Sequence, residues 1–400
     1  MIPEEYIALE DRFGANNYHP LDVVLSRGER VWVYDVKGVK YLDFLSGYSA
    51  LNQGHCHPRL VKVISEQAGR LTLTARAFRN DQLPLLCREI CELTGFDRIL
   101  PMNSGAEAVE TAIKAVRKWA YTVKGVEPDR AEIITFENNF HGRTIAVISC
   151  STEPQYKANF GPLTPGFPVV PYGDIEAVKR AFTPNTAAVL IEPVQGEGGI
   201  IVPPEGYLKQ VGDLCCAHNA LLILDEIQSG LGRCGKLFAH YYEDVHPDGV
   251  IVGKALSGGF YPVSALLARD ELMRVFKPGD HGSTFGGNPL ACAIAREALR
   301  ILLDENLPQR AHQLGDYFMD RLRSIKSRHI KEVRGRGLLI GVELVPQAGG
   351  ARRFCEALEK EGLLCKETRE NVLRFAPPLV IEKDELDWAF DRIKPVLESL

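Results

Sequence analysis

The middle of this 400-residue chain contains a series of short apolar segments, each followed by polar or glycine-rich residues. They lie at residues 131–135, 187–191, 220–224 and 249–252 and are rich in Ile, Val and Leu. Between them the apolar residues have helical spacing. Such segments are typical of strands in a parallel sheet that is buried on both faces. The sequence therefore predicts an α/β fold with ligands at the carboxyl ends of the strands.

The two ends of the chain have a different pattern. Residues 28–46 alternate as short strands around a turn at Lys37 and Gly38, and residues 305–400 predict a helix, a strand at 337–344, a helix near 352–361 and a final helix after Lys383. We expect a large domain at residues 49–304 and a smaller α+β domain formed by residues 1–48 and 305–400. One continuous large domain is the alternative, because a length of 400 residues does not separate the two.

Composition and charge exclude several classes of protein. The net charge of -5 argues against a nucleic-acid binder. No apolar run reaches the roughly 20 residues of a membrane span, and the first residues lack a secretory signal. The ten cysteines have neither a paired framework nor zinc spacing, so we expect mostly reduced core cysteines, a cytoplasmic protein and no metal.

Residues 102–107 precede a helical pattern, and Ser104 with Glu107 fits a capping box. A well-capped helix explains this motif without any ligand. The functional alternative is a phosphate cradle, because small residues expose backbone N–H groups at the positive end of a helix.

Asp225 and Lys254 each follow a predicted buried strand. Asp225 either forms a structural ion pair or holds a ring nitrogen protonated, since an unpaired buried carboxylate is costly. Lys254 is either a lysine extending from a sheet edge to solvent or a desolvated amine suited to a Schiff base. Phosphate cradle, carboxylate and lysine on three strand ends are the parts needed to hold pyridoxal 5'-phosphate (PLP).

The chain resembles the class III aminotransferases nearly end to end, and within that class the members that act on ornithine. These enzymes use PLP and have the aspartate-aminotransferase-like fold, called fold type I, with a large mostly parallel-sheet domain and a smaller α+β domain. The matching stretches are residues 17–20, 46–55, 139–144, 192–197, 225–228, 281–289 and 374–378.

The resemblance assigns cofactor roles. Lys254 would form the Schiff base with PLP and then shuttle a proton, while Asp225 would pair with the ring nitrogen. Gln228 would reach the ring hydroxyl, and Phe140 would stack on the ring; an ordinary core aromatic is the alternative for Phe140.

The phosphate of PLP is assigned to two segments. Ser104, Gly105 and Ala106 would bind it from the same chain. Ser283 and Thr284 would reach the phosphate of the neighbouring subunit, which implies a homodimer with shared sites, or a higher oligomer. A glycine-rich loop with satisfied hydroxyls is the alternative for this pair.

The resemblance also implies the substrates, ornithine and 2-oxoglutarate, in arginine and proline metabolism. Arg143 with Tyr18 would bind the carboxylate far from the ring, because a guanidinium binds a carboxylate bidentately. Arg374 would bind the carboxylate beside the keto group, and Glu197 would neutralise it while ornithine reacts. Tyr48 would bond the α-amino group of ornithine, and the related acetylornithine and 4-aminobutyrate enzymes are the alternative.

Three other classes fit the sequence less well. Residues 230–235 spell G-x-G-x-x-G, but residues 225–229 separate them from the strand, as a nicotinamide-binding fingerprint does not allow. His55 and His57 flank Cys56 without a third spaced ligand for a metal hydrolase. A binding protein that kept only the scaffold would not need Lys254 and Asp225.

Overall fold

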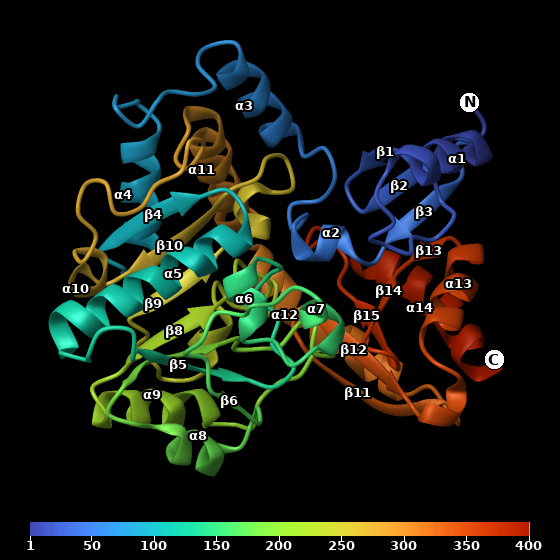
Figure 1. Cartoon of the computed structure of the whole chain (residues 1–400). Helices are drawn as coiled ribbons and strands as arrows, with labels where there is room; N and C mark the ends of the chain where they lie inside the picture. Colours follow the sequence, from blue (N-terminus) through green and yellow to red (C-terminus); the bar gives the residue numbers. More distant parts are fainter. Residues whose placement is uncertain (400) are drawn as a thin grey trace.

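The computed structural model describes residues 1–399 (Figure 1). Its larger body is built on a seven-stranded sheet in the order β4-β10-β9-β8-β7-β5-β6. The strands are β4 (Arg98–Met102), β5 (Glu132–Phe136), β6 (Val169–Val170), β7 (Thr186–Ile191), β8 (Leu221–Asp225), β9 (Gly249–Val252) and β10 (Ser264–Ala268). The predicted apolar segments are thus strands, within one residue at either end.

This sheet is covered on both faces, as the continuous apolar strands predict. Leu222 and Leu224 of β8 pack in a core formed with α3 (Pro58–Ala68), α4 (Leu83–Thr94), α8 (Ile175–Ala181), α9 (Tyr207–Ala217) and α11 (Pro289–Asp304). Leu221 and Ile223 pack in a core formed with α5 (Gly105–Trp119), α6 (Ile145–Ser149) and α10 (Asp270–Met273). Because successive residues of a strand point to opposite faces, every position of β8 is buried.

The sheet is mostly parallel, with one exception. Strands β9, β8, β7, β5 and β6 pair in parallel, whereas β10 is antiparallel to both β9 and β4. The connection from β9 to β10 holds only the 3-10 helix η3 (Lys254–Ser257) and a loop. A parallel neighbour needs a longer crossover, usually through a helix, so this short connection reverses the strand.

The two ends of the chain build two smaller four-stranded sheets. One contains β1 (Leu25–Glu29), β2 (Trp32–Asp35), β3 (Lys40–Asp43) and β13 (Leu363–Leu364), and β13 pairs with β3. The other contains β11 (Ile330–Arg336), β12 (Leu339–Leu344), β14 (Lys366–Thr368) and β15 (Val372–Phe375). The termini therefore lie in the same part of the molecule (Figure 1). The boundaries at residues 48 and 304 stay a prediction.

Helices surround the three sheets (Figure 1). The main ones are α1 (Pro3–Phe13), α3 (Pro58–Ala68), α4 (Leu83–Thr94), α5 (Gly105–Trp119), α8 (Ile175–Ala181), α9 (Tyr207–Ala217), α11 (Pro289–Asp304), α12 (Leu307–Arg323), α13 (Arg352–Lys360) and α14 (Lys383–Ser399). The short ones are α2 (Ser46–Ser49), α6 (Ile145–Ser149), α7 (Pro154–Lys157), α10 (Asp270–Met273), the π-helix η1 (Ala120–Lys124) and the 3-10 helices η2 (Ala239–Tyr242) and η4 (Pro346–Ala348).

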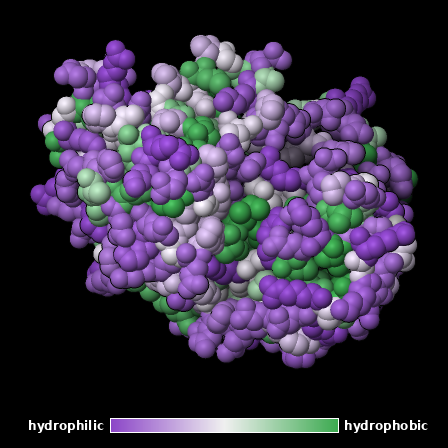
Figure 2. Space-filling view, turned by 90° about the horizontal axis from the view of Figure 1, so that it is seen from below, coloured by the Kyte–Doolittle hydropathy of each residue, from purple (hydrophilic) through white to green (hydrophobic). Residues whose placement is uncertain are grey.

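The surface agrees with the composition. Seen from below, hydrophilic side chains dominate and apolar residues gather in separate patches (Figure 2). Within residues 1–399, no helix combines the length and the apolar character needed to cross a bilayer. All ten cysteines are free thiols, and six are buried: Cys150, Cys215, Cys234, Cys292, Cys355 and Cys365.

Candidate active site

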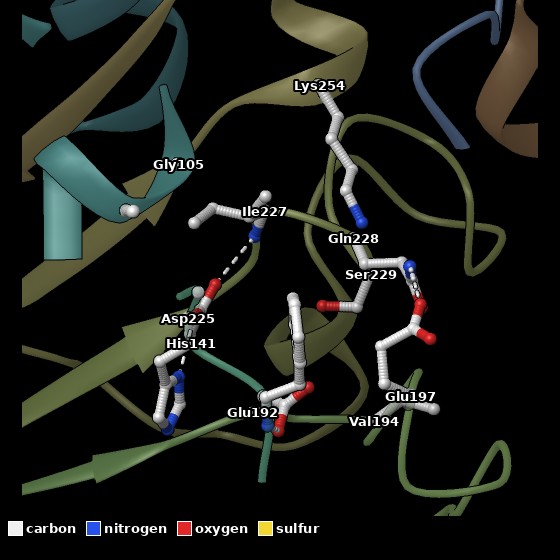
Figure 3. A pocket seen from close by; sticks show the side chains of 13 residues that line it. Gly105, His141, Glu192, Val194, Glu197, Asp225, Ile227, Gln228, Ser229 and Lys254 are labelled. Carbon is white, nitrogen blue, oxygen red and sulfur yellow. Dashed lines mark hydrogen bonds and ion pairs between the residues drawn. The ribbon is translucent and has the colours of Figure 1, made fainter. Parts of the chain in front are cut away.

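A cavity of about 180 Å3 lies where four strands of the large sheet end at their carboxyl ends. Residues that follow β5, β7, β8 and β9 line it together with the N-terminus of α5 (Figure 3). The lining residues are Gly105, Ala106, Phe140, His141, Gly142, Glu192, Val194, Glu197, Asp225, Ile227, Gln228, Ser229 and Lys254. Seven of them are residues that the sequence predicted for the site.

Lys254 enters the cavity from η3, directly after β9, and its amine points towards Gln228 (Figure 3). Burial lowers the pKa of its Nζ to about 8, while the charge of Glu197 opposes and that of Arg374 adds to this shift. An amine with this pKa is largely neutral slightly above pH 8, which is the form that attacks a carbonyl. Its φ of 44° is left-handed, an uncommon conformation for a long side chain.

Asp225, the last residue of β8, is held at both carboxylate oxygens. His141 Nδ1 lies 2.7 Å from Oδ2, and the backbone N–H of Ile227 donates to Oδ1 over 3.1 Å. Burial alone lowers the pKa of His141, but the hydrogen bond and charge of Asp225 raise it overall. These two hydrogen bonds fix the orientation of the carboxylate, so that it can face a ring nitrogen in the cavity.

Glu192 lies at the end of β7 and completes this buried group. Its Oε2 accepts the backbone N–H of Phe140 at 3.0 Å. The pKa of Glu192 is raised to about 7, mainly by burial; the charge of His141 opposes this rise and that of Asp225 contributes to it. Glu192 and His141 were not singled out from the sequence; a histidine beside a carboxylate two strands away leaves no local pattern.

The N-terminus of α5 has the predicted capping box. Ser104 accepts the N–H of Glu107 at 3.2 Å, and the Glu107 carboxylate accepts the N–H of Ser104 at 2.8 Å. Within residues 1–399, no hydrogen bond is described for the N–H groups of Gly105 and Ala106, both of which line the cavity. A Cβ on Gly105 would approach Ile227 to 3.0 Å, so the glycine keeps this anion-binding end open.

Gln228 provides a second sign of a missing partner. Its Oε1 is buried and has no hydrogen bond among residues 1–399, and it lies so close to Gly196 that a Cβ there would meet it at 1.5 Å. An orphaned buried acceptor is costly unless a ligand supplies the donor. The open helix end, the fixed carboxylate of Asp225, the buried amine of Lys254 and this acceptor fit the phosphate, nitrogen, aldehyde and hydroxyl of PLP.

Phe140 lines the cavity, whereas Arg143 lies at its exterior. The Arg143 guanidinium stands 3.5 Å from the ring centre of Tyr156 and 5.5 Å from that of Phe140. Among the described residues it has no ion pair, so its charge is available to a carboxylate.

Glu197 and Arg374 form the ion pair that the sequence interpretation requires. Arg374 is 1% exposed, and Gln228 also donates to Glu197 Oε1 over 3.3 Å. Burial raises the pKa of Glu197, but the charges of Arg374 and Lys254 lower it overall. Tyr48 lies 5.1 Å under the Arg374 guanidinium, and burial raises its pKa.

Seven predicted residues do not line the cavity: Ser104, Tyr48, Arg143, Arg374, Tyr18, Ser283 and Thr284. Tyr18 is 71% exposed on the segment after α1, although it is close enough to affect the pKa of Tyr48. Thr284 is exposed, and Ser283 accepts a hydrogen bond from Asn103 at 2.8 Å. A single chain does not bring Ser283 or Thr284 to its own cavity.

The glycine-rich stretch at residues 230–235 has a structural role. Its Arg233 is fully buried and donates to the carbonyls of Leu338 and Pro377 and to Ser46 and Asn52. It thereby links the turn that carries Tyr48 to the segment after Arg374. Within residues 1–399, no group of side chains could hold a metal ion.

The sequence and the structure were compared with those of known proteins. Residues 13–397 match the family described as aminotransferase class-III. The chain is 59% identical to an ornithine aminotransferase of Geobacillus sp. (strain WCH70), over 99% of both chains. It superposes with a TM-score of 0.98 on an ornithine aminotransferase structure from Toxoplasma gondii with partial occupancy of PLP, at 49% identity, covering 99% and 94% of the chains. An acetylornithine aminotransferase from Elizabethkingia anophelis superposes with a TM-score of 0.91, at 49% identity over 99% of both chains.

Proposed function

The chain belongs to the class-III aminotransferase family, and from this premise we propose that it transfers the terminal amino group of ornithine to 2-oxoglutarate, giving glutamate 5-semialdehyde and glutamate. The observation that carries the choice of substrate is the Glu197–Arg374 ion pair beside the amine of Lys254. A closed pair offers no free cation near the reacting centre, so a substrate that keeps its carboxylate away from that centre is favoured.

The cofactor is PLP, and when bound it withdraws electrons from the carbon that bears the transferred amino group. Lys254 supplies a neutral Nζ that takes a proton from that carbon and returns it elsewhere. Asp225, held by His141, presents its carboxylate to the ring nitrogen at the end of β8. The N–H groups of Gly105 and Ala106 bind phosphate at the positive end of α5.

Arg143 and Tyr18 hold the α-carboxylate of ornithine in this proposal, and Tyr48 bonds its α-amino group. In the second half-reaction, 2-oxoglutarate brings two carboxylates. Arg143 takes the distal one, and Glu197 releases Arg374 for the other. Support comes from Arg143, which has no ion pair within residues 1–399, and from the burial of Arg374, because a buried charge is costly unless the substrate carboxylate replaces that of Glu197.

The working unit is a homodimer in this proposal. Thr284 is exposed and Ser283 lies beside Asn103, just before the phosphate-binding end of α5, so a second copy can contribute these hydroxyls across an interface. Ten free cysteines suit a reducing compartment, which supports a cytoplasmic location.

A spectrum and a turnover assay test this function. Protein reconstituted with PLP should show a visible absorption band that borohydride removes and that Lys254→Ala lacks. Ornithine alone should bleach the band, and 2-oxoglutarate should restore it, as two separate half-reactions require. A band that ornithine leaves unchanged would refute the proposal.

The second candidate is an acetylornithine or 4-aminobutyrate aminotransferase. The similarity to the Elizabethkingia chain favours the first of these. A donor panel with ornithine, N-acetylornithine and 4-aminobutyrate decides between them. The free α-ammonium of ornithine offers three charged donors to the Tyr48 hydroxyl, whereas the acetylated nitrogen is uncharged and keeps one N–H. Higher kcat/KM for N-acetylornithine than for ornithine would replace the first proposal by the second.

A further inference from the structure

The segment that carries Tyr18 is held by one arginine of another element. Residues 14–24 connect α1 to β1 without regular structure. Arg352, the first residue of α13, donates from Nη1 to the carbonyl of His19 over 3.2 Å and from Nη2 to the carbonyl of Pro20 over 3.0 Å. These two bonds adjoin Tyr18, whose side chain is 71% exposed.

The same guanidinium is itself held in place. Its Nε donates to Glu356 over 2.9 Å, one turn along α13, and Nη1 lies 3.8 Å from Glu367 Oε1. The guanidinium therefore contacts two carboxylates, one on α13 and one on β14, and at the same time the two carbonyls of the Tyr18 segment. An arginine fork suits this geometry because its donors have fixed directions.

Glu367 extends the network to the strand of Arg374. Its Oε1 also lies 3.1 Å from Lys366 Nζ, and Lys366 is paired directly with Arg374 across β14 and β15. Residues directly opposite in an antiparallel pair project from the same face of the sheet. Thr368, two residues on and so on that face as well, donates to the Glu197 carbonyl over 2.8 Å.

We propose that Arg352 is a positioning residue for substrate binding, which fixes the Tyr18 segment and couples it through Glu367 and Lys366 to the strand of Arg374. The inference rests on the proposed function, because it takes Tyr18 as a contact of the substrate carboxylate. In this proposal the position of Tyr18 is fixed by a residue of α13, far along the chain, rather than by the N-terminal segment itself.

We expect the position of the Tyr18 segment to affect the binding of ornithine more than the rate of the chemical step. Tyr18 is remote from Lys254 in this scheme, so a displaced segment weakens the hold on ornithine while the reacting groups keep their places. A misplacement of about 1 Å in a binding group can change a rate constant by up to about 100-fold. We expect a smaller effect here, since Arg143 still binds the same carboxylate.

The experiment compares Arg352→Met with the reconstituted wild-type enzyme. Arg352→Met should raise KM for ornithine about ten-fold and change kcat less than about two-fold, because it removes two charge-assisted bonds to the segment. The KM of Arg352→Lys should lie between the values of wild type and Arg352→Met, since one ammonium cannot bind both carbonyls as the two-pronged guanidinium does. Lys360→Met, at the other end of the same helix and exposed, is the matched control and should match wild type.

A double-mutant cycle and hydrogen exchange exclude a merely structural role. In a Tyr18→Phe background, Arg352→Met should raise KM less than about two-fold further, because both changes act through one contact. Amide exchange in residues 15–22 should accelerate in Arg352→Met and not in Lys360→Met.

The inference would be overturned by any one of three results: a KM that Arg352→Met leaves unchanged, a double mutant whose KM rises by the product of the two single effects, or unchanged amide exchange in residues 15–22. If Arg352→Met does not fold, the same measurements on Arg352→Lys decide. A wild-type enzyme that fails to use ornithine would refute the proposed function instead, and the exchange experiment would still decide whether Arg352 holds the segment.

Discussion

Removing the carboxylate of Glu197 should change which end of a donor the enzyme accepts. In the structure Arg374 is 1% exposed and pairs with Glu197, while its Nε and Nη2 have no hydrogen-bond partner in the described part of the chain. Glu197→Ala leaves this guanidinium with its charge uncompensated beside Lys254. A donor with a carboxylate next to the reacting amine, such as glutamate, can then take the empty place.

The size of the change follows from that one interaction. A hydrogen bond to a charged group contributes about 1.5–3 kcal/mol, so the ratio of kcat/KM for glutamate over ornithine should rise about ten- to 150-fold. Glu197→Gln keeps the shape and an acceptor oxygen without the charge, and should give a smaller rise. The ornithine reaction itself should slow, because the α-end of ornithine now competes for Arg374.

Steady-state kinetics with both donors, at a fixed concentration of the keto acid, measures this ratio. Glu332→Gln is the matched control, since Glu332 also pairs with an arginine, Arg334 at 2.8 Å, on the outer side of the small body. An unchanged ratio in Glu197→Ala with a folded, cofactor-loaded enzyme would show that the pair does not select the donor.

Further predictions concern the cofactor and the donor. Tyr48→Ile should raise the ratio of kcat/KM for 4-aminobutyrate over ornithine about five-fold, since it removes a hydroxyl that only ornithine uses. A ratio equal to that of wild type in steady-state assays would contradict this. Capture of PLP by the apoprotein should speed up with rising pH and level off above about pH 8, because Lys254 loses its proton with a pKa of about 8; stopped-flow rates still rising towards pH 10 would disprove it. His141→Asn should weaken PLP binding about ten-fold in a titration by removing a charged donor to Asp225, whereas His246→Asn, at an exposed histidine, should not; equal affinities would exclude this role.

Local features of the molecule follow from the sequence alone. The apolar segments of β7, β8 and β9 and the capping box of Ser104 and Glu107 depend on residues a few positions apart, and the structure has them. The reversal of β10 has no such local signal, because strand direction depends on how the connection packs rather than on the strand itself.

Pairs of residues far apart along the chain were beyond local patterns. Asp225 and His141 are 84 residues apart and Glu197 and Arg374 are 177 apart. The Glu197–Arg374 pair was expected only through resemblance to a family, and His141 and Glu192 were not singled out at all. Nothing in the spacing of such residues reveals which carboxylate a buried cation meets.

The sequence by itself determined the class of fold, and it predicted as site residues the amine of Lys254, directly after β9, and the carboxylate of Asp225, at the end of β8. Three features were decided by tertiary structure alone. His141 is hydrogen-bonded to Asp225, Gln228 Oε1 has no partner within residues 1–399, and Arg352 donates to the carbonyl of His19, 333 positions earlier in the chain. Hydrophobic period and helix capping act within one element, so neighbouring residues are enough to predict them. Burial, charge compensation and pKa arise only where several elements meet, and they are properties of the packed chain.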